Sequence, residues 1–403
     1  MSSPAFATVT IERILPGGLG LAHADGFTLF VALAAPGDVV RVRIDRVRGK
    51  VAFASIEEII ELSSVRVQPL CPYFGVCGGC DFQQLNYQAQ LDAKTEMIRD
   101  CLRRIAQIES PPEIAIHSAP QEWQYRRRAN WQLDPVTQQL GYFESGSHRV
   151  CDVEECAVLA PRLQEILGRV RSAIHSGSVA VLPKDIRAVA GDHDVSVSPP
   201  LAEFQTNDVS LSVAGESYSF NADSFFQVSP GLLERLIGEA VSNAGQESAQ
   251  RALAIDLYCG AGLFTLPLAR RFTRVIGIEV NERASSFASK NLQHANLKNA
   301  EVVTSGVGQW LKENAQSFPS VDFLLLDPPR AGAENIVIKG ILDLQPRHIS
   351  YVSCDPATLA RDLKKLLAAG YTVDSVSAFD MFPQTHHVET VVHLRIKGAY
   401  LTL

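Results

Sequence analysis

The chain has 403 residues, enough for two or three domains, and its 46% hydrophobic and 20% charged content is ordinary for a globular protein. The net charge of −7 argues against a uniformly basic nucleic-acid binder but is compatible with local basic patches. The N-terminus lacks a basic segment followed by an apolar one, and no apolar run reaches about 18 residues. We therefore expect no signal peptide and no membrane span, and we predict a cytoplasmic protein.

Residues 1–62 are predicted to form a small β-barrel. Four or five short strands separated by turns in about sixty residues are typical of a barrel of the OB type, which often binds single-stranded nucleic acid. The basic run Arg41–Lys50 could add phosphate affinity, although a solvated strand face is the alternative. The strand-like runs are Ala7–Ile14, Gly26–Ala32, Asp38–Val47 and Val51–Ile60.

Residues 63–220 form a less regular central domain whose topology the sequence does not predict. Apolar residues at near-helical spacing predict a helix over Asn86–Ile105, and strand-like pieces lie around Tyr125–Leu133 and Gln139–Glu144. The segment Trp123–Arg128 interleaves aromatic and arginine side chains. That pattern can hold RNA by stacking and by phosphate contacts, and solvated strand residues are again the alternative.

The central domain also contains clustered cysteines. Cys71, Cys77 and Cys80 follow the spacing Cys-x5-Cys-x2-Cys, and Cys156 lies further along the chain. Thiolates at this spacing can converge on one metal centre, and four of them suit either zinc or a 4Fe-4S cluster. Cys151 is an alternative fourth ligand.

Residues 221–403 alternate strands and helices, which predicts a Rossmann-like, doubly wound α/β domain. Most of its strands are continuous apolar runs, as expected for strands that are buried on both faces. The predicted strands are Ala252–Leu257, Arg274–Glu279, Glu301–Thr304, Asp322–Leu326, His348–Ser353, Thr372–Phe379 and Val388–Arg395.

A cofactor site is predicted at the first strand of this domain. The strand leads into a turn with Gly260 and Gly262, where glycines allow close backbone approach to a ligand at a helix start. Glu279 ends the second strand and could accept hydrogen bonds from a ribose diol, and Asp327 follows the fourth strand. The dinucleotide pattern needs a third glycine that is absent, so we favour S-adenosylmethionine over NAD.

Cys354 directly follows the strand His348–Ser353, with Asp327 upstream and Glu389 downstream. In a doubly wound sheet, ligands bind where strands end. A cysteine and acidic residues at successive strand ends therefore suggest covalent chemistry on a bound substrate.

Four long motifs resemble those of the RNA 5-methyluridine methyltransferases that use S-adenosylmethionine. Ser224–Val228 resembles the family's Phe-Phe-Gln motif, and Asp256–Gly260 resembles its first cofactor motif. Ser353–Pro356 resembles the nucleophile motif, and Phe379–Glu389 resembles the segment that ends in the catalytic base. The resemblance covers nearly the whole chain, and its N-terminal barrel is similar to a TRAM domain.

The resemblance implies a role for each candidate residue. Cys354 would attack C6 of uracil as a thiolate, C5 would take the methyl group, and Glu389 would remove the C5 proton. The resemblance also implies cofactor contacts at Gln227, Tyr258, Gly260, Glu279 and Asp327. It implies 4Fe-4S ligands at Cys71, Cys77, Cys80 and Cys156. The match therefore favours the cluster over zinc, and Cys156 over Cys151 as the fourth ligand.

The partner implied by the resemblance is RNA, most consistently 23S ribosomal RNA because the TRAM-like barrel and the cluster occur together. A transfer-RNA enzyme is the nearest alternative. A cysteine hydrolase with His386 or His387 as its base is a second one, although it would leave the cofactor motifs unused. The third is a non-catalytic RNA-binding or iron–sulfur sensor protein. No membrane and no obligate protein partner are expected.

Overall fold

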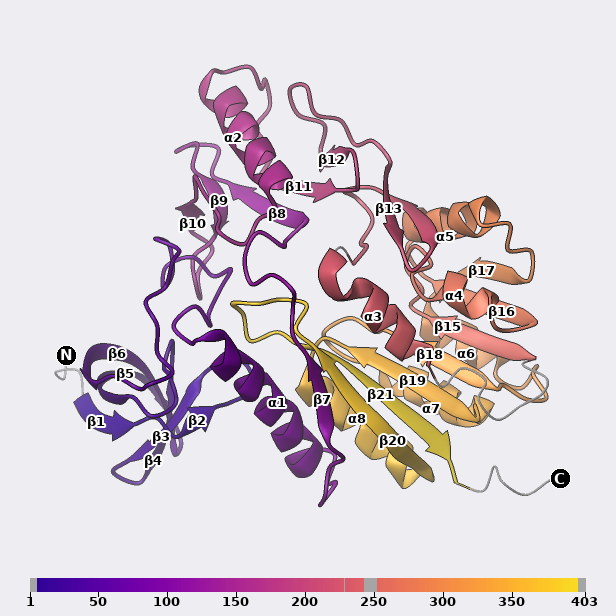
Figure 1. Cartoon of the computed structure of the whole chain (residues 1–403), viewed down its shortest axis with the longest axis horizontal. Helices are drawn as coiled ribbons and strands as arrows, with labels where there is room; N and C mark the ends of the chain where they lie inside the picture. Colours follow the sequence, from indigo (N-terminus) through magenta and orange to yellow (C-terminus); the bar gives the residue numbers. More distant parts are fainter. Residues whose placement is uncertain (1–5, 228, 243–251, 398–403) are drawn as a thin grey trace.

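The computed structural model describes residues 6–227, 229–242 and 252–397. Its N-terminal region is a curled six-stranded sheet in the order β1-β5-β6-β4-β3-β2 (Figure 1). Small and β-branched side chains fill its interior, as expected for a small barrel. The prediction missed β3, because a cluster of turn residues directly precedes it. The strands are β1 (Phe6–Thr10), β2 (Arg13–Ile14), β3 (Gly20–Ala24), β4 (Phe27–Val31), β5 (Val39–Arg48) and β6 (Val51–Glu61).

The predicted helix of the central domain is confirmed as α1 (Tyr87–Arg104). The side chain of Asn86 caps it by accepting a hydrogen bond from the Ala89 amide at 2.9 Å. The apolar stripe of α1 packs into the same core as the C-terminal sheet. After α1, β7 (Ile114–His117) pairs in parallel with the C-terminal strand β20. This part of the middle of the chain therefore completes the C-terminal sheet.

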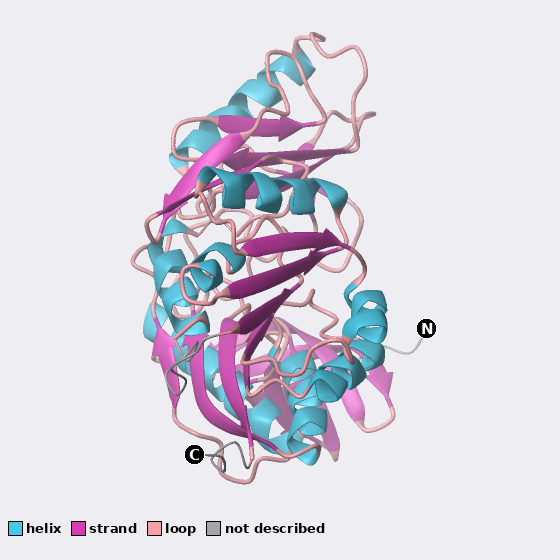
Figure 2. Cartoon of the chain, turned by 90° about the vertical axis from the view of Figure 1, so that its right-hand side faces the viewer, coloured by secondary structure: helices cyan, strands magenta, loops and turns pink. Residues whose placement is uncertain are grey.

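The rest of the central domain is a five-stranded sheet in the order β10-β9-β8-β11-β12, covered by α2 (Pro161–His175) and followed by the β13–β14 hairpin. In both views it lies at the end of the molecule away from the C-terminus (Figures 1 and 2). The strands are β8 (Arg128–Leu133), β9 (Leu140–Phe143), β10 (Val150–Asp152), β11 (Asp185–Ala190), β12 (Val195–Ser198), β13 (Val209–Val213) and β14 (Glu216–Phe220).

The C-terminal domain is built on an eight-stranded sheet in the order β17-β16-β15-β18-β19-β21-β20-β7. The first five strands of that order are parallel, and β21 runs antiparallel to both of its neighbours. All seven strands predicted from apolar runs are confirmed to within a residue or two. They are β15 (Leu253–Leu257), β16 (Arg274–Glu279), β17 (Ala300–Thr304), β18 (Phe323–Leu326), β19 (His348–Ser353), β20 (Tyr371–Phe379) and β21 (Glu389–Ile396).

Helices cover both faces of this sheet, which confirms the doubly wound architecture. One face packs against α1, α6, α7 and α8, and the other against α3, α4 and α5. The carboxyl ends of the parallel strands meet at one edge, and antiparallel β21 begins at that same edge. The helices are α3 (Pro230–Ala240), α4 (Thr265–Ala269), α5 (Glu282–His294), α6 (Val307–Asn314), α7 (Asn335–Leu344) and α8 (Pro356–Ala368).

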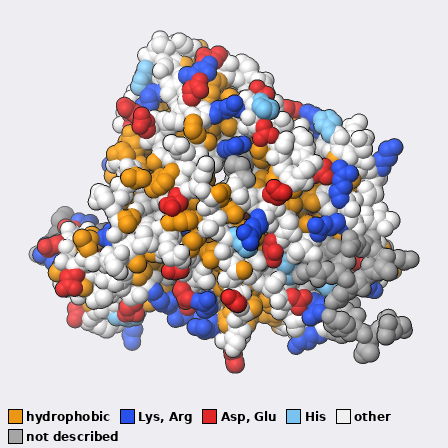
Figure 3. All heavy atoms as spheres, in the orientation of Figure 1, with side chains coloured by type: hydrophobic (Ala, Val, Ile, Leu, Met, Phe, Trp, Pro, Cys, Tyr) orange, Lys and Arg blue, Asp and Glu red, His pale blue; other side chains and the backbone are white. Residues whose placement is uncertain are grey.

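The surface has no single dominant charge on the face seen in Figure 3, where acidic and basic side chains are interspersed. Within the described ranges, no helix combines the length and hydrophobicity that crossing a bilayer requires.

Candidate active site

The turn after β15 is tightly folded and is tied to the end of β16. Tyr258 and Gly260 have φ values of 64° and 55°, and Gly262 has a φ of 90°. The Gly260 amide donates a 3.0 Å hydrogen bond to one oxygen of Glu279, whose other oxygen accepts from the Asn281 amide at 2.7 Å. A Cβ atom added to Gly260 would meet no other atom within 4 Å, so open space lies beside this turn. This geometry suits a bound ligand whose ribose reaches Glu279.

Two acids lie beside the turn, of which Asp256 is fully buried and Asp327 is partly buried. Asp256 is fully buried in β15 and accepts a 2.6 Å hydrogen bond from Thr265, which leaves its Oδ1 atom without a partner. Asp327 follows β18, where its amide donates to the Leu257 carbonyl at 3.3 Å. Burial raises the pKa of each carboxyl to about 7. These two acids favour the binding of a cation at this part of the site.

Cys354 and Glu389 face each other across the β19–β21 pair. The antiparallel register places Ser353 opposite Thr390, so the next residues along, Cys354 and Glu389, are opposite one another at the edge of the sheet. Asp355 then caps α8 by accepting from the Thr358 amide at 2.8 Å. The thiol therefore lies at a strand-to-helix turn, with a half-buried environment and a buried carboxyl beside it.

The electrostatics of this pair favour its neutral forms while no substrate is bound. Burial, followed by the charges of Glu389 and Asp327, raises the pKa of the Cys354 thiol to about 12. Burial and Asp327 raise the pKa of Glu389 to about 8. The guanidinium of Arg330 opposes both effects. A bound cation would lower both pKa values, so cofactor binding is expected to activate the site.

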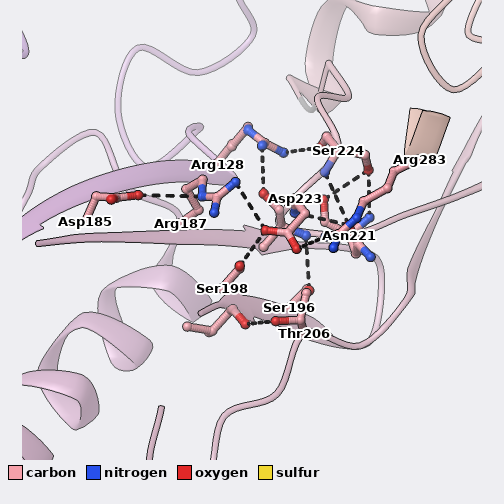
Figure 4. A network of polar contacts seen from close by, with 12 residues as sticks. Arg128, Asp185, Arg187, Ser196, Ser198, Thr206, Asn221, Asp223, Ser224 and Arg283 are labelled. Carbon is pink, nitrogen blue, oxygen red and sulfur yellow. Dashed lines mark hydrogen bonds and ion pairs between the residues drawn. The ribbon is translucent and has the colours of Figure 1, made fainter. Parts of the chain in front are cut away.

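Gln227, in the segment that precedes α3, also contacts this pair. Its Nε2 atom donates a hydrogen bond to Glu389 at 3.4 Å. The preceding loop is held by a polar network (Figure 4). Arg128 donates to the carbonyls of Ser224 at 2.8 Å and Ala222 at 3.0 Å. Asp223 pairs with arginines from β11 and α5. The network joins the central sheet to the C-terminal domain at Gln227. Val228 of the same motif lies outside the described residues.

The four predicted cluster ligands line one pocket in the central domain. Its walls include the thiols of Cys71, Cys77, Cys80 and Cys156 and the side chain of Arg126. All eight cysteines of the chain are free thiols, and Cys151 is buried in β10 outside the lining of this pocket. Burial raises the pKa of Cys77 to about 11 and that of Cys80 to about 12. In the described residues, no set of three or more His, Cys, Asp or Glu side chains is close enough together to hold a single metal ion.

Three side chains of the segment Trp123–Arg128, where RNA contacts were predicted, are used inside the protein, and an RNA contact by the rest of the segment stays a prediction. Tyr125 is buried and donates to the Pro383 carbonyl at 2.9 Å. Arg126 lines the cysteine pocket, and Arg128 holds the loop before Gln227. Interleaved aromatic and basic residues predict stacking surfaces only when they are exposed.

Arg330, a residue with no predicted role, is the main cationic influence on the pKa values of Cys354 and Glu389. Its guanidinium donates to Nε2 of His387 at 3.2 Å, and burial lowers the pKa of that histidine to about 3. His387 is therefore neutral and occupied as an acceptor, which argues against a hydrolase that uses it as a base. The position of Arg330 in the sequence, directly after the Asp-Pro-Pro segment, could have indicated that it belongs to the site.

The fold and this strand-edge site define an S-adenosylmethionine-dependent methyltransferase. Residues 202–397 match the family described as tRNA (Uracil-5-)-methyltransferase, and residues 7–56 match the TRAM domain. A full-length relative from Pseudomonas putida, described as a 23S rRNA (uracil(1939)-C(5))-methyltransferase, is 32% identical and covers 94% of this chain and 92% of its own length. The chain belongs to the RNA uracil-C5 methyltransferase family.

Two further comparisons agree with this assignment. An uncharacterized RNA methyltransferase of Thermosynechococcus vestitus is 31% identical, with 95% of this chain and 96% of the relative covered. The crystal structure of Pyrococcus abyssi tRNA (uracil-54, C5)-methyltransferase in complex with S-adenosyl-L-homocysteine superposes with a TM-score of 0.72. That structure is 24% identical and covers 96% of this chain and 100% of its own, so it supports the fold alone.

Proposed function

We propose that this enzyme methylates C5 of a specific uridine in 23S ribosomal RNA through a covalent adduct between Cys354 and C6 of the base. The observation that carries the proposal is the placement of Cys354 opposite Glu389 at the sheet edge where the parallel strands end. A nucleophile and a base close together at one edge of the sheet match the two tasks that methylation of an unreactive carbon requires.

The residues can perform the reaction in three steps. The Cys354 thiolate bonds to C6, and the electron pair of the C5–C6 double bond moves to C5 as an enolate. C5 takes the methyl group from the sulfonium of S-adenosylmethionine, and neutral S-adenosylhomocysteine leaves. Glu389 then accepts the C5 proton, the double bond re-forms, and the thiolate departs. A carboxylate with its pKa raised to about 8 is a stronger base than an ordinary one.

The cofactor would lie across the ends of β15, β16 and β18. We propose that Glu279 binds the ribose and that Tyr258 forms one wall of the site. The backbone would approach the cofactor most closely at Gly260. Asp327 and Gln227 lie near Glu389, in the part of the site where the methyl group must be transferred. Their acidic and amide oxygens favour the positive sulfonium group over its neutral product.

The choice of ribosomal RNA rests on relatives described as 23S rRNA (uracil(1939)-C(5))-methyltransferases, which align over nearly their whole length at about 30% identity. A transfer-RNA substrate is the alternative, which the description of the matched family favours. A uridine stacked in RNA must be turned out of its stack to reach Cys354.

The cysteine pocket would hold a 4Fe-4S cluster on Cys71, Cys77, Cys80 and Cys156. Four thiols in the lining of one pocket suit this group in number and kind, and the guanidinium of Arg126 would balance part of its negative charge. The cluster would bring the binding energy that fixes an irregular segment in place. The Cys71–Cys80 loop itself supplies the connection between the N-terminal barrel and α1.

The test is incubation of the purified enzyme with methyl-labelled S-adenosylmethionine and unmodified ribosomal or transfer RNA, followed by mapping of the labelled nucleotide. Label at C5 of one uridine in 23S ribosomal RNA is the expected result. Label only in transfer RNA would keep the mechanism and overturn the substrate. No label in either RNA, with S-adenosylmethionine bound, would refute the proposed reaction.

A further inference from the structure

The loop between β20 and β21, residues 380–388, leads directly into Glu389 and is held almost entirely by residues from the central domain. Its first amide, that of Asp380, donates to the His117 carbonyl of β7 at 2.9 Å. The amide of His386 donates to Asp81 at 2.8 Å, and the His386 ring also contacts that carboxylate. Asp81 directly follows Cys80, so the anchor is continuous with the cysteine pocket.

The most heavily anchored residue of the loop is Gln384, which is 2% exposed. It has a φ of 69°, in the left-handed region that costs energy for a residue with a Cβ atom. Its carbonyl accepts from the amides of Asp81 at 3.1 Å and Phe82 at 3.0 Å. Its amide donates to Oε1 of Gln90 at 2.9 Å, while its side-chain oxygen accepts from Nε2 of Gln90 at 3.0 Å.

Two more anchors come from buried polar side chains. Lys94 of α1 pairs with Asp380 at 2.5 Å, and the side chains of both residues are completely buried. Lys94 also donates to the Phe382 carbonyl at 3.2 Å. The hydroxyl of Tyr125 donates to the next carbonyl, that of Pro383, at 2.9 Å. Three successive loop carbonyls are thus each bound by the central domain.

Gln90 and Lys94 are unusual residues for their positions. They lie one helical turn apart on the buried face of α1, where apolar side chains would be expected. A buried amide and a buried ammonium are costly unless they are fully bonded. Here the bonds that satisfy them all lead to the loop or to the carbonyl of Leu85 at the start of the helix. The presence of Gln90 and Lys94 at these buried positions is explained if the 380–388 loop needs one fixed conformation.

We propose that Gln90, Lys94 and Tyr125 are positioning residues that fix the loop and thereby place the Glu389 carboxylate for removal of the C5 proton. This inference rests on the proposed function, because it assigns Glu389 to the last step. Loosening the loop should slow that step selectively. Attack by Cys354 and methyl transfer use the ends of β18 and β19, which contact the loop through the hydrogen bond between Arg330 and His387 and not through the three anchoring residues.

The test follows the covalent adduct rather than overall activity. Each variant is mixed with RNA and methyl-labelled S-adenosylmethionine for a single turnover, and the denaturation-resistant, labelled protein–RNA complex is measured over time. Gln90→Leu removes the contacts with Gln384 at similar volume. Gln88→Leu makes the same change on the exposed face of α1 and is the matched control. Glu389→Gln is the positive control for trapping.

The expected result is that Gln90→Leu accumulates the methylated adduct and resolves it on the order of 10²-fold more slowly than the wild type, as for a base displaced by about 1 Å. Gln88→Leu should match the wild type. Tyr125→Phe removes one hydroxyl from an intact core and should slow resolution about tenfold, as for one lost buried hydrogen bond, which keeps the test decisive if Gln90→Leu does not fold.

Two results would overturn the inference. One is resolution at the wild-type rate in Gln90→Leu and Tyr125→Phe. The other is an equal loss of adduct formation and resolution, which indicates a purely structural role. If Glu389→Gln itself traps no adduct, the proposed function fails. If it traps adduct and the anchor variants do not, the positioning role alone fails.

Discussion

The substitution Glu389→Gln is expected to stabilise the substrate-free protein while it destroys turnover. Burial and Asp327 raise the pKa of Glu389 from 4.5 to about 8, so the folded state holds a proton that the unfolded state releases between these pH values. Its contribution to the free energy of unfolding therefore falls as pH rises through that window. Glutamine keeps the shape and does not titrate.

The magnitude follows from the pKa difference. One pKa unit corresponds to about 1.4 kcal/mol, so Glu389→Gln should gain about 3 kcal/mol more stability at about pH 8.5 than at about pH 5.5. Urea unfolding at the two pH values measures this difference. The control is Glu109→Gln at an exposed position, where both pH values should give the same small change. A gain for Glu389→Gln that does not depend on pH would refute the electrostatic account of the site.

Three further outcomes are expected. Cys354→Ala should abolish transfer of labelled methyl groups and leave the dissociation constant of S-adenosylmethionine unchanged; residual methylation would contradict its assignment as nucleophile. Cys156→Ser should lower the iron and sulfide content of anaerobically purified protein, while Cys151→Ser should leave both as in the wild type; the reverse pattern would exchange their roles. Asp38→Ala should destabilise the N-terminal barrel by about 3 kcal/mol in urea unfolding, because it leaves the guanidinium of Arg66 unpaired; an unchanged midpoint would contradict this.

The sequence predicted the C-terminal domain well because its strands are buried on both faces. The run Phe323–Leu326 is apolar at every position, and the core includes all four side chains. Short or half-exposed elements gave weaker signals. The four-residue strand β7 was missed, because its pairing partner β20 lies more than two hundred residues away. Only tertiary pairing makes that segment a strand.

The positions of Cys354 and Glu389 at strand ends could be predicted from the sequence, and their catalytic roles stay predictions. The supporting residues of the candidate site were not predictable, because their partners are remote in sequence. Gln90 and Lys94 interrupt the apolar stripe of a helix that the sequence did predict, and that interruption is a usable signal. What they bind depends on a loop almost three hundred residues further along the chain.

The covalent mechanism is best tested by trapping the complex of Glu389→Gln with RNA and S-adenosylmethionine, digesting it, and identifying the crosslinked peptide and nucleotide by mass spectrometry. We expect a single methylated uridine attached to the peptide that contains Cys354. Attachment through another residue, or methylated RNA with no covalent intermediate, would contradict it.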